Sequence, residues 1–153
     1  MFKRQVLLEC ISALLILLFV YASLSKFLDF NTFYREMHNQ PLPKSWTPFL
    51  VWLIPCSEVA ISVSLIFERT RLLGFYGSLI VMGLFTIYTG IILAHFFPYI
   101  PCSCGGVIKR LTWTQHLILN LSFVALSIAG VIFQQRKRFT KITFTNQTKN
   151  SFV

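Results

Sequence analysis

Two cysteines separated by a single residue are the sharpest chemical feature of the sequence. Cys102 and Cys104 lie in the segment PCSCGG over residues 101–106. A disulfide between them would close a small, strained ring, and strained, exposed disulfides tend to be the oxidising, readily exchanged ones. The proline before the pair restrains the backbone, whereas the two glycines after it leave the backbone free. This pattern favours thiol–disulfide exchange, with a structural or inert pair and a metal site as the alternatives.

Two histidines lie near the same ends of apolar stretches as the cysteine pair. An imidazole of His95 or His116 within a few ångströms of either cysteine would stabilise the thiolate, which is the attacking species. The alternative is an interfacial histidine with its ring among lipid headgroups. Two cysteines and two histidines also form a possible metal set, but their spacing matches no zinc-site pattern, so we expect no metal centre.

An acidic residue and a third cysteine lie inside an apolar stretch. The segment IPCSEV over residues 54–59 holds both, and Glu58 lies about 14 Å along a helix that starts at Phe49. An ionisable group at that depth in a membrane is costly and indicates function by default. We expect Glu58 to be neutral and hydrogen-bonded across the bundle, as a structural or a proton-linked group. Cys56 is a candidate relay to the outer cysteines, although packing is the commoner role of a buried cysteine.

Four apolar stretches must position these residues. Of the 153 residues, 55% are hydrophobic and 12% are charged, whereas soluble proteins have roughly 25% charged residues. Each stretch is long enough to supply the roughly 20 residues that a helix needs to cross a bilayer. They cover residues 6–24, 49–67, 72–97 and 113–133. The sequence therefore predicts an all-α membrane protein, with a four-transmembrane-helix bundle over residues 1–140.

The first stretch has an alternative interpretation as a cleaved signal peptide, because Lys3 and Arg4 precede it and VYA at residues 20–22 fits a small-residue cleavage site. Its 19 residues exceed the usual apolar core of about 7–15, and Glu9 interrupts it. We therefore expect it to remain as a membrane span.

The segments outside these stretches predict one further helix and a tail. Apolar side chains recur at helical spacing from Phe27 to Met37 with charged residues between them, which is typical of a short interfacial helix in the headgroup region. Pro41 and Pro43 end that helix. Residues 141–153 are polar and rich in Thr and Asn, so we expect a disordered tail.

The third stretch carries small residues at intervals of three or four. Such a stripe predicts that a neighbouring helix approaches closely. Its members are Gly83, Thr86, Gly90 and Ala94.

The distribution of positive charge predicts the topology. Nine of the 14 Lys and Arg residues lie before the first stretch, between the second and third, or after the fourth. The positive-inside rule then places both termini in the cytoplasm and the cysteine pair outside a bacterial inner membrane, where conditions are oxidising. Because the basic residues flank apolar stretches, membrane topology explains the net charge of +9, and we expect no nucleic-acid partner.

The combination of motifs resembles the methylamine utilisation MauE family, which is related to the DoxX-like four-helix membrane proteins. The motifs are SKF at residues 25–27, Pro55 with Glu58, and CSCG at residues 102–105. The resemblance covers roughly residues 5–135. It implies a multi-pass inner-membrane protein that supports maturation of the disulfide-rich small subunit of methylamine dehydrogenase, alongside a thioredoxin-like periplasmic partner.

These observations together predict a thiol–disulfide oxidoreductase component that relays electrons between thiols outside the membrane. In this hypothesis Cys102 and Cys104 exchange, and a periplasmic client protein receives the disulfide. One alternative is a non-catalytic assembly factor or membrane anchor with incidental cysteines. Another is a DoxX-like subunit of a quinone-linked oxidoreductase; no other cofactor is evident from the sequence.

The predicted topology can be tested by labelling. After mild reduction of intact cells, a membrane-impermeant thiol reagent should modify Cys102 or Cys104 and leave Cys10 unmodified, because only the pair lies outside. Mass spectrometry of the labelled peptides measures this. Labelling of the pair only after the inner membrane is permeabilised would contradict the orientation.

Overall fold

The computed structural model describes the backbone of residues 2–94 and 112–150, and side chains within 4–94, 112 and 114–137. The secondary-structure elements follow one another in the order α1 (Phe2–Leu28), α2 (Phe30–His38), a 3-10 turn (Lys44–Trp46), α3 (Thr47–Ile66), α4 (Arg71–Leu93) and α5 (Trp113–Asn150). Four helical segments are long and apolar enough to cross a membrane: Arg4–Leu28, Lys44–Ile66, Arg71–Leu93 and Thr114–Lys137. The predicted all-α, four-helix membrane bundle is confirmed.

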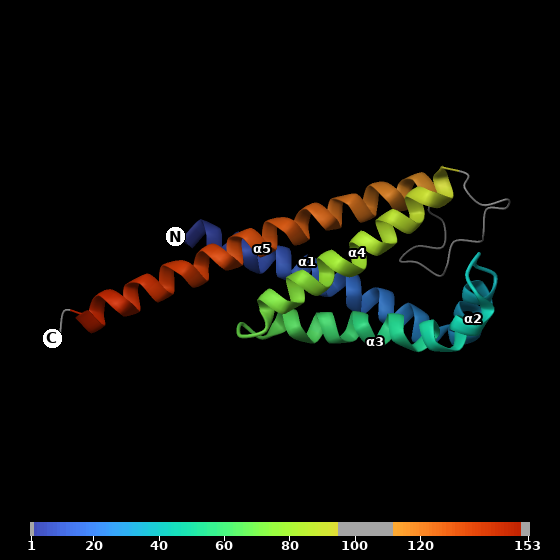
Figure 1. Cartoon of the computed structure of the whole chain (residues 1–153), viewed down its shortest axis with the longest axis horizontal. Coiled ribbons are helices and arrows are strands. Elements are labelled where there is room, and N and C mark those ends of the chain that lie inside the picture. Colours follow the sequence, from blue (N-terminus) through green and yellow to red (C-terminus); the bar gives the residue numbers. More distant parts are fainter. Residues whose placement is uncertain (1, 95–111, 151–153) are drawn as a thin grey trace.

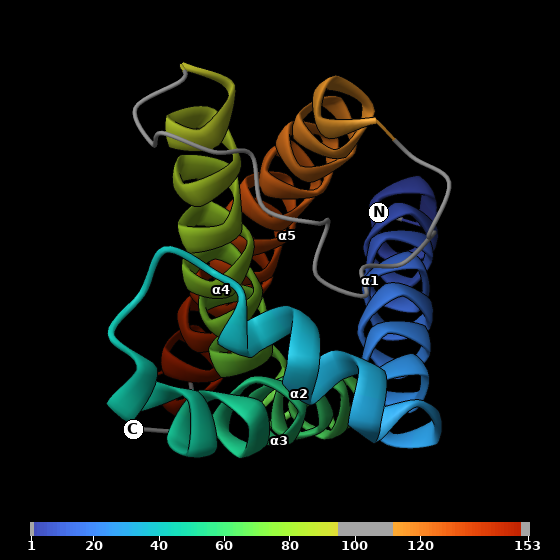
Figure 2. The same cartoon turned by 90° about the vertical axis from the view of Figure 1, so that its right-hand side faces the viewer.

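The four long helices run antiparallel along the molecule (Figure 1). The N-terminal end of α1, the turn from α3 to α4 and the C-terminal part of α5 lie at one end, which we call the terminal end. Helix α2 lies at the other end, the α2 end. Viewed along the bundle, α2 crosses in front of it between α1 and α4 (Figure 2). Both chain ends therefore lie on the same side of the bundle, as an even number of spans requires.

Helix α1 shows how the apolar sequence divides between core and lipid. One face of the helix is buried in the main hydrophobic core, and its residues recur at helical spacing. They are Leu8, Ile11, Leu15, Leu18 and Phe19, of which Leu15 is fully buried. The opposite face leaves equally large side chains exposed, Leu17 at 69%. An apolar outer face is the expected surface for a helix that contacts lipid tails.

The turn between α3 and α4 is fixed by side chains that satisfy the end of α3. The last carbonyls of a helix have no partner within it. The Thr70 hydroxyl donates to the Ser64 carbonyl at 3.0 Å, and Arg71 Nε donates to the Leu65 carbonyl at 3.2 Å. Arg71 also pairs with Glu9 of α1, Nη1 to Oε1, at 2.8 Å. One residue thereby ties three helices together at the terminal end.

Helix α2 confirms the predicted short helix after the first span. Phe33 and Met37 are buried and pack against Val51 of α3, while Tyr34 and Arg35 face outward. Its placement among lipid headgroups remains a prediction.

The close helix contacts involve other glycines than those expected. A Cβ atom at Gly130 would lie 2.3 Å from the Phe75 ring, and one at Gly74 would lie 2.8 Å from the Leu65 side chain. At Gly83 and Gly90 such an atom would meet nothing within 4 Å. The prediction that the 83–94 stripe seats a neighbouring helix is therefore wrong at its two glycines, because α4 packs most tightly near its start.

The last helix is longer than the fourth predicted span. α5 continues to Asn150, so the backbone of residues 141–150 is helical where the sequence predicts a disordered tail. Adding residues to an existing helix is far easier than starting one, which explains how Thr- and Asn-rich residues join it. For the third span, α4 ends at Leu93, and residues 95–97 of the predicted stretch lie outside the described part of the chain.

The glycine contacts predict opposite effects of one substitution at two positions. Gly130→Ala should destabilise the protein by about 1–3 kcal/mol, because the buried Phe75 ring must move to admit a methyl group. Gly83→Ala should leave stability unchanged or raise it by up to about 1 kcal/mol through helix propensity. Thermal unfolding in detergent measures both. Equal stability of the two variants would contradict the packing described here.

Candidate functional site

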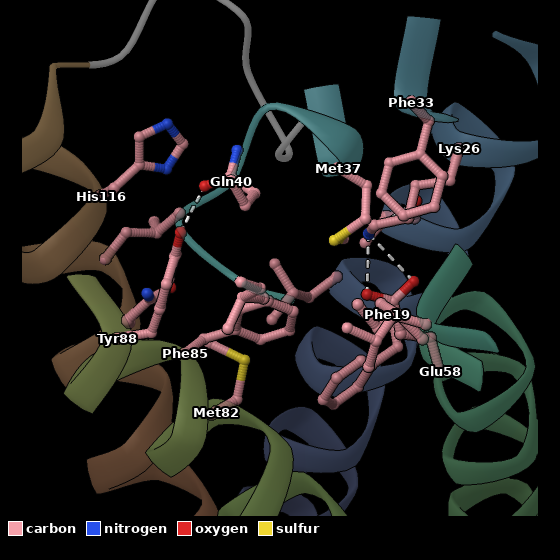
Figure 3. A pocket seen from close by; sticks show the side chains of 17 residues that line it. Phe19, Lys26, Phe33, Met37, Gln40, Glu58, Met82, Phe85, Tyr88 and His116 are labelled. Carbon is pink, nitrogen blue, oxygen red and sulfur yellow. Dashed lines mark hydrogen bonds and ion pairs between the residues drawn. The ribbon is translucent and has the colours of Figure 1, made fainter. Parts of the chain in front are cut away.

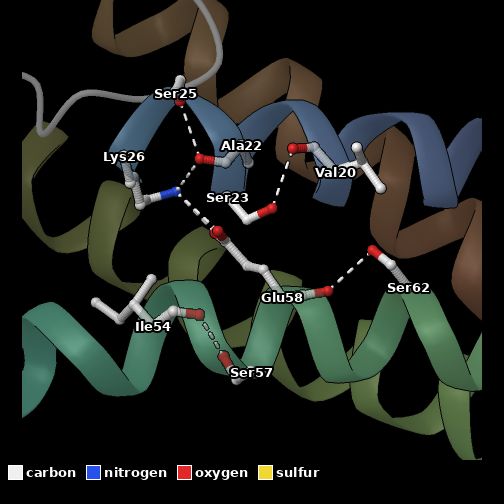
Figure 4. Close-up of polar contacts among 9 residues, drawn as sticks. All are labelled: Val20, Ala22, Ser23, Ser25, Lys26, Ile54, Ser57, Glu58 and Ser62. Carbon is white, nitrogen blue, oxygen red and sulfur yellow. Dashed lines mark hydrogen bonds and ion pairs between the residues drawn. The ribbon is translucent and has the colours of Figure 1, made fainter. Parts of the chain in front are cut away.

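A buried ion pair joins α1 to α3. Lys26 Nζ lies 2.8 Å from Glu58 Oε1 and 3.1 Å from Oε2 (Figure 4), and the side chains are 7% and 3% exposed. The ammonium also donates to the Ala22 carbonyl at 3.3 Å. The Phe33 ring of α2 lies 5.9 Å from it, within range of a cation–π contact. Oxygen atoms and a ring face thus surround the charge of Lys26.

The local structure of both helices directs the two side chains toward each other. Side chains on a helix lean toward its N-terminus, so Lys26, close to the end of α1, points back into the bundle. On α3, Pro55 lies within the helix and is buried, and it has no backbone N–H to donate to the preceding turn. Three residues later, the Glu58 carbonyl accepts a hydrogen bond from the Ser62 hydroxyl at 2.9 Å.

A cavity of about 220 Å³ adjoins the ion pair. All five helices contribute to its walls, and most of the lining is apolar. Figure 3 shows Lys26 and Glu58 at one side, with Phe19 and Phe33 near them, and Phe85 in the middle of the view. The cavity therefore lies within the membrane-spanning part of the chain, at the α2 end.

The opposite side of the cavity carries a second group of polar side chains. Tyr88 of α4 donates a hydrogen bond to Gln40 Oε1, just after α2, and both line the cavity together with His116 (Figure 3). Asn120 also lines it and lies one helical turn after His116 on α5, which places the two on the same face. The cavity thus has polar groups on two walls and apolar side chains between them.

The structure assigns a partner to one predicted residue and a location to another. Glu58 was expected to be neutral and hydrogen-bonded across the bundle; it does bond across the bundle, but to a lysine, in the geometry of an ion pair. His116 is half-buried in the cavity wall. His95, Cys102 and Cys104 lie outside the described residues, so their proximity to His116 is untested.

Cys56 is exposed on α3, and Cys10 is exposed on α1. The expectation that Cys56 packs in the interior is therefore wrong: it lies one position after the buried Pro55, on the side of α3 turned away from the core. Cys56 is also absent from the residues that line the cavity.

Among residues 2–94 and 112–150, no three His, Cys, Asp or Glu side chains come together as a metal site would require.

Sequence reasoning missed Lys26 as a site residue. It follows an apolar stretch that ends at residue 24, so it was counted among the basic residues of an outer loop. The sequence signal that could have identified Lys26 is Glu58, the single acidic residue inside the second stretch. A buried charge requires an opposite charge nearby. Lys26, at the end of the first span, is a basic residue that can supply this charge.

The family model described as methylamine utilisation protein MauE matches residues 4–133, which include the first three spans and most of the fourth. The chain belongs to the MauE family. Among curated proteins and among solved structures, none matches it. This confirms the family resemblance, and the bundle adds a physical link between two of the motifs: Lys26 of the SKF segment and Glu58 after Pro55 are ion-pair partners. This MauE-family chain is a multi-pass membrane protein.

The ion pair predicts a strong, coupled effect on stability. Glu58→Gln leaves the Lys26 charge buried without a carboxylate, so it should destabilise the protein by about 3–5 kcal/mol, as should Lys26→Met. A neutral Glu58 would instead tolerate Gln. The double variant Lys26→Met with Glu58→Leu should recover most of the loss, because no unpaired charge remains.

The exposed pair of Lys137 and Glu68, 3.1 Å apart, offers a matched control. Removing either of its partners should cost less than about 1 kcal/mol, since water screens both charges. Thermal unfolding in detergent compares the two pairs. Additive losses at Lys26 and Glu58 would contradict the coupling.

Proposed function

We propose that the chain is the membrane component of a thiol–disulfide electron relay that supports disulfide formation in proteins outside the bacterial inner membrane. Cys102 and Cys104 are the exchanging pair. A thioredoxin-like periplasmic protein is the direct partner, and a disulfide-containing client is the final recipient. Within the MauE family the implied client is the small subunit of methylamine dehydrogenase.

The observation that carries this proposal is the position of the cysteine pair in the chain. Residues 95–111 connect the end of α4 to the start of α5, and both helix ends lie away from the terminal end (Figure 1). With both termini in the cytoplasm, this connection is on the outer side, where the compartment is oxidising. The chain therefore enters and leaves the segment that holds the pair at the α2 end of the bundle.

The other two cysteines support the same assignment by their positions. Cys10 and Cys56 are both free and exposed on the outside of the bundle, on different helices. Neither neighbours another cysteine in the sequence. A dithiol able to cycle between reduced and oxidised forms within one chain is therefore best supplied by Cys102 and Cys104.

The exchange balances without a further group. A thiolate of the partner attacks one sulfur of the Cys102–Cys104 disulfide, forms a mixed disulfide and releases the other sulfur as a thiolate. The second thiol of the partner then attacks the mixed disulfide. The partner becomes oxidised by two electrons, and the cysteine pair becomes a dithiol.

Single cysteine variants test this proposal. The exchange is reversible, so a single remaining cysteine of the pair can attack the disulfide of an oxidised partner and form the mixed disulfide. Without the second cysteine, the Cys102–Cys104 bond cannot close to resolve it. Either Cys102→Ser or Cys104→Ser should therefore accumulate a complex with the thioredoxin-like partner that reductant dissolves. Non-reducing electrophoresis after an acid quench, followed by mass spectrometry of the shifted band, measures this. Cys56→Ser is the matched control and should behave as the wild type.

A non-catalytic assembly factor gives a different outcome. If neither single variant traps a partner and the double variant Cys102→Ser/Cys104→Ser still supports client maturation, the cysteines are incidental. The relay would then be wrong, and the assembly-factor hypothesis would replace it.

A further inference from the structure

We propose that the terminal end of the bundle binds the phosphate headgroup of an anionic phospholipid, where α5 passes the turn between α3 and α4. Four exposed side chains form the site, which we call the turn patch: Glu68 and Arg69 in the turn, and Arg136 and Lys137 on α5. This binding depends on neither the cysteine pair nor its redox role.

An ion pair joins the two elements that form the turn patch. Lys137 Nζ lies 3.1 Å from Glu68 Oε1, which holds α5 against the turn. Close by, Gln135 of α5 donates a hydrogen bond to the Tyr76 hydroxyl of α4 at 2.6 Å. Arg69 follows Glu68 in the chain and Arg136 precedes Lys137, so basic residues from two distant parts of the sequence meet at one junction.

The turn patch carries an excess of positive charge. It holds three basic side chains and one carboxylate, and ion pairs within it leave this excess unchanged, because the carboxylate neutralises only one positive charge. A surface with such an excess attracts anions. A guanidinium also presents a planar fork of N–H donors that matches the geometry of a phosphate group.

The two ends of the bundle differ in net charge. Among the side chains that the structure describes, the terminal end has five basic and two acidic residues, and the α2 end has three of each. The residues of the terminal end are Arg4, Arg69, Arg71, Arg136 and Lys137, with Glu9 and Glu68; those of the α2 end are Lys26, Arg35 and Lys44, with Asp29, Glu36 and Glu58. Within the described part of the chain, an anionic ligand is therefore attracted to the terminal end.

The position of the turn patch relative to the spans favours a lipid over a soluble anion. The second span ends at Ile66, the third begins at Arg71, and Lys137 is the last residue of the fourth. The turn patch therefore lies at the boundary of the apolar helices, at the depth of lipid headgroups. Basic residues just outside a membrane span are attracted to anionic lipids. The acyl chains of a phospholipid hold its phosphate at this same depth.

A pair of matched lipids tests the proposal. Phosphatidylglycerol and phosphatidylcholine with the same acyl chains differ only in the headgroup, which is anionic in the first and neutral overall in the second. We expect the full-length protein to bind phosphatidylglycerol at least roughly fivefold more tightly, the effect of one basic residue at a membrane surface. Native mass spectrometry of the protein released from micelles with equal amounts of both lipids measures this. Equal occupancy by the two lipids would overturn the proposal.

Two variants with opposite expected effects locate the binding in the turn patch. Arg69→Gln with Arg136→Gln should reduce the preference for phosphatidylglycerol by at least roughly threefold, because two positive charges are lost. Glu68→Gln should raise the preference, because it removes the carboxylate that opposes them. General loss of structure cannot produce opposite effects at neighbouring residues. A preference that is unchanged in the arginine variant, or reduced by Glu68→Gln, would overturn the assignment.

The exposed basic residues Arg35 and Lys44 of the α2 end supply a matched control. Arg35→Gln with Lys44→Gln removes the same amount of charge and should leave the preference unchanged. A loss equal to that of the arginine variant would show a response to total charge and overturn the site. Inorganic phosphate added in the same amount as the lipid should not displace it; displacement would assign the turn patch to a soluble anion and overturn the lipid.

Discussion

Two opposite charges held 2.8 Å apart in an apolar bundle are the constraint on which the rest of the structure depends. Lipid tails cannot solvate either charge, so each needs the other inside the protein. This requirement fixes how α1 lies along α3, because Lys26 and Glu58 meet only in one register. It also places polar atoms at one wall of the cavity, where apolar packing alone would have excluded them.

The bundle is packed unevenly along its length. At the terminal end, Gly74 and Gly130 allow Leu65 and Phe75 to approach the backbone, and Arg71 binds groups of α1 and α3. Toward the α2 end, the space around Gly83 and Gly90 is open. Helix α4 is therefore packed most tightly near its start, and the cavity lies beside its later part, at Met82, Phe85 and Tyr88.

The sequence was sufficient to predict the helices, because the features that indicate a membrane span are local. The length and apolar composition of each stretch predicted the four membrane-spanning helices, and the helical spacing of apolar side chains predicted α2. The pairing of Lys26 with Glu58 was not predicted, since it joins residues 32 positions apart and depends on how two helices are turned. The same reason explains the errors at Cys56 and at the glycine stripe. Spacing along a helix shows which residues share a face, but the face that meets a neighbour is set by the whole bundle.

Helix α2 is attached to both sides of the cavity. Phe33 lies over the Lys26 ammonium on the α1 side, and Gln40, just beyond the helix, accepts a hydrogen bond from Tyr88 on α4. A molecule that passes between α2 and the bundle therefore has to break one of these contacts. Opening of this face is then governed by how often α2 detaches, so substitutions that loosen or tighten the packing of α2 change access to the cavity.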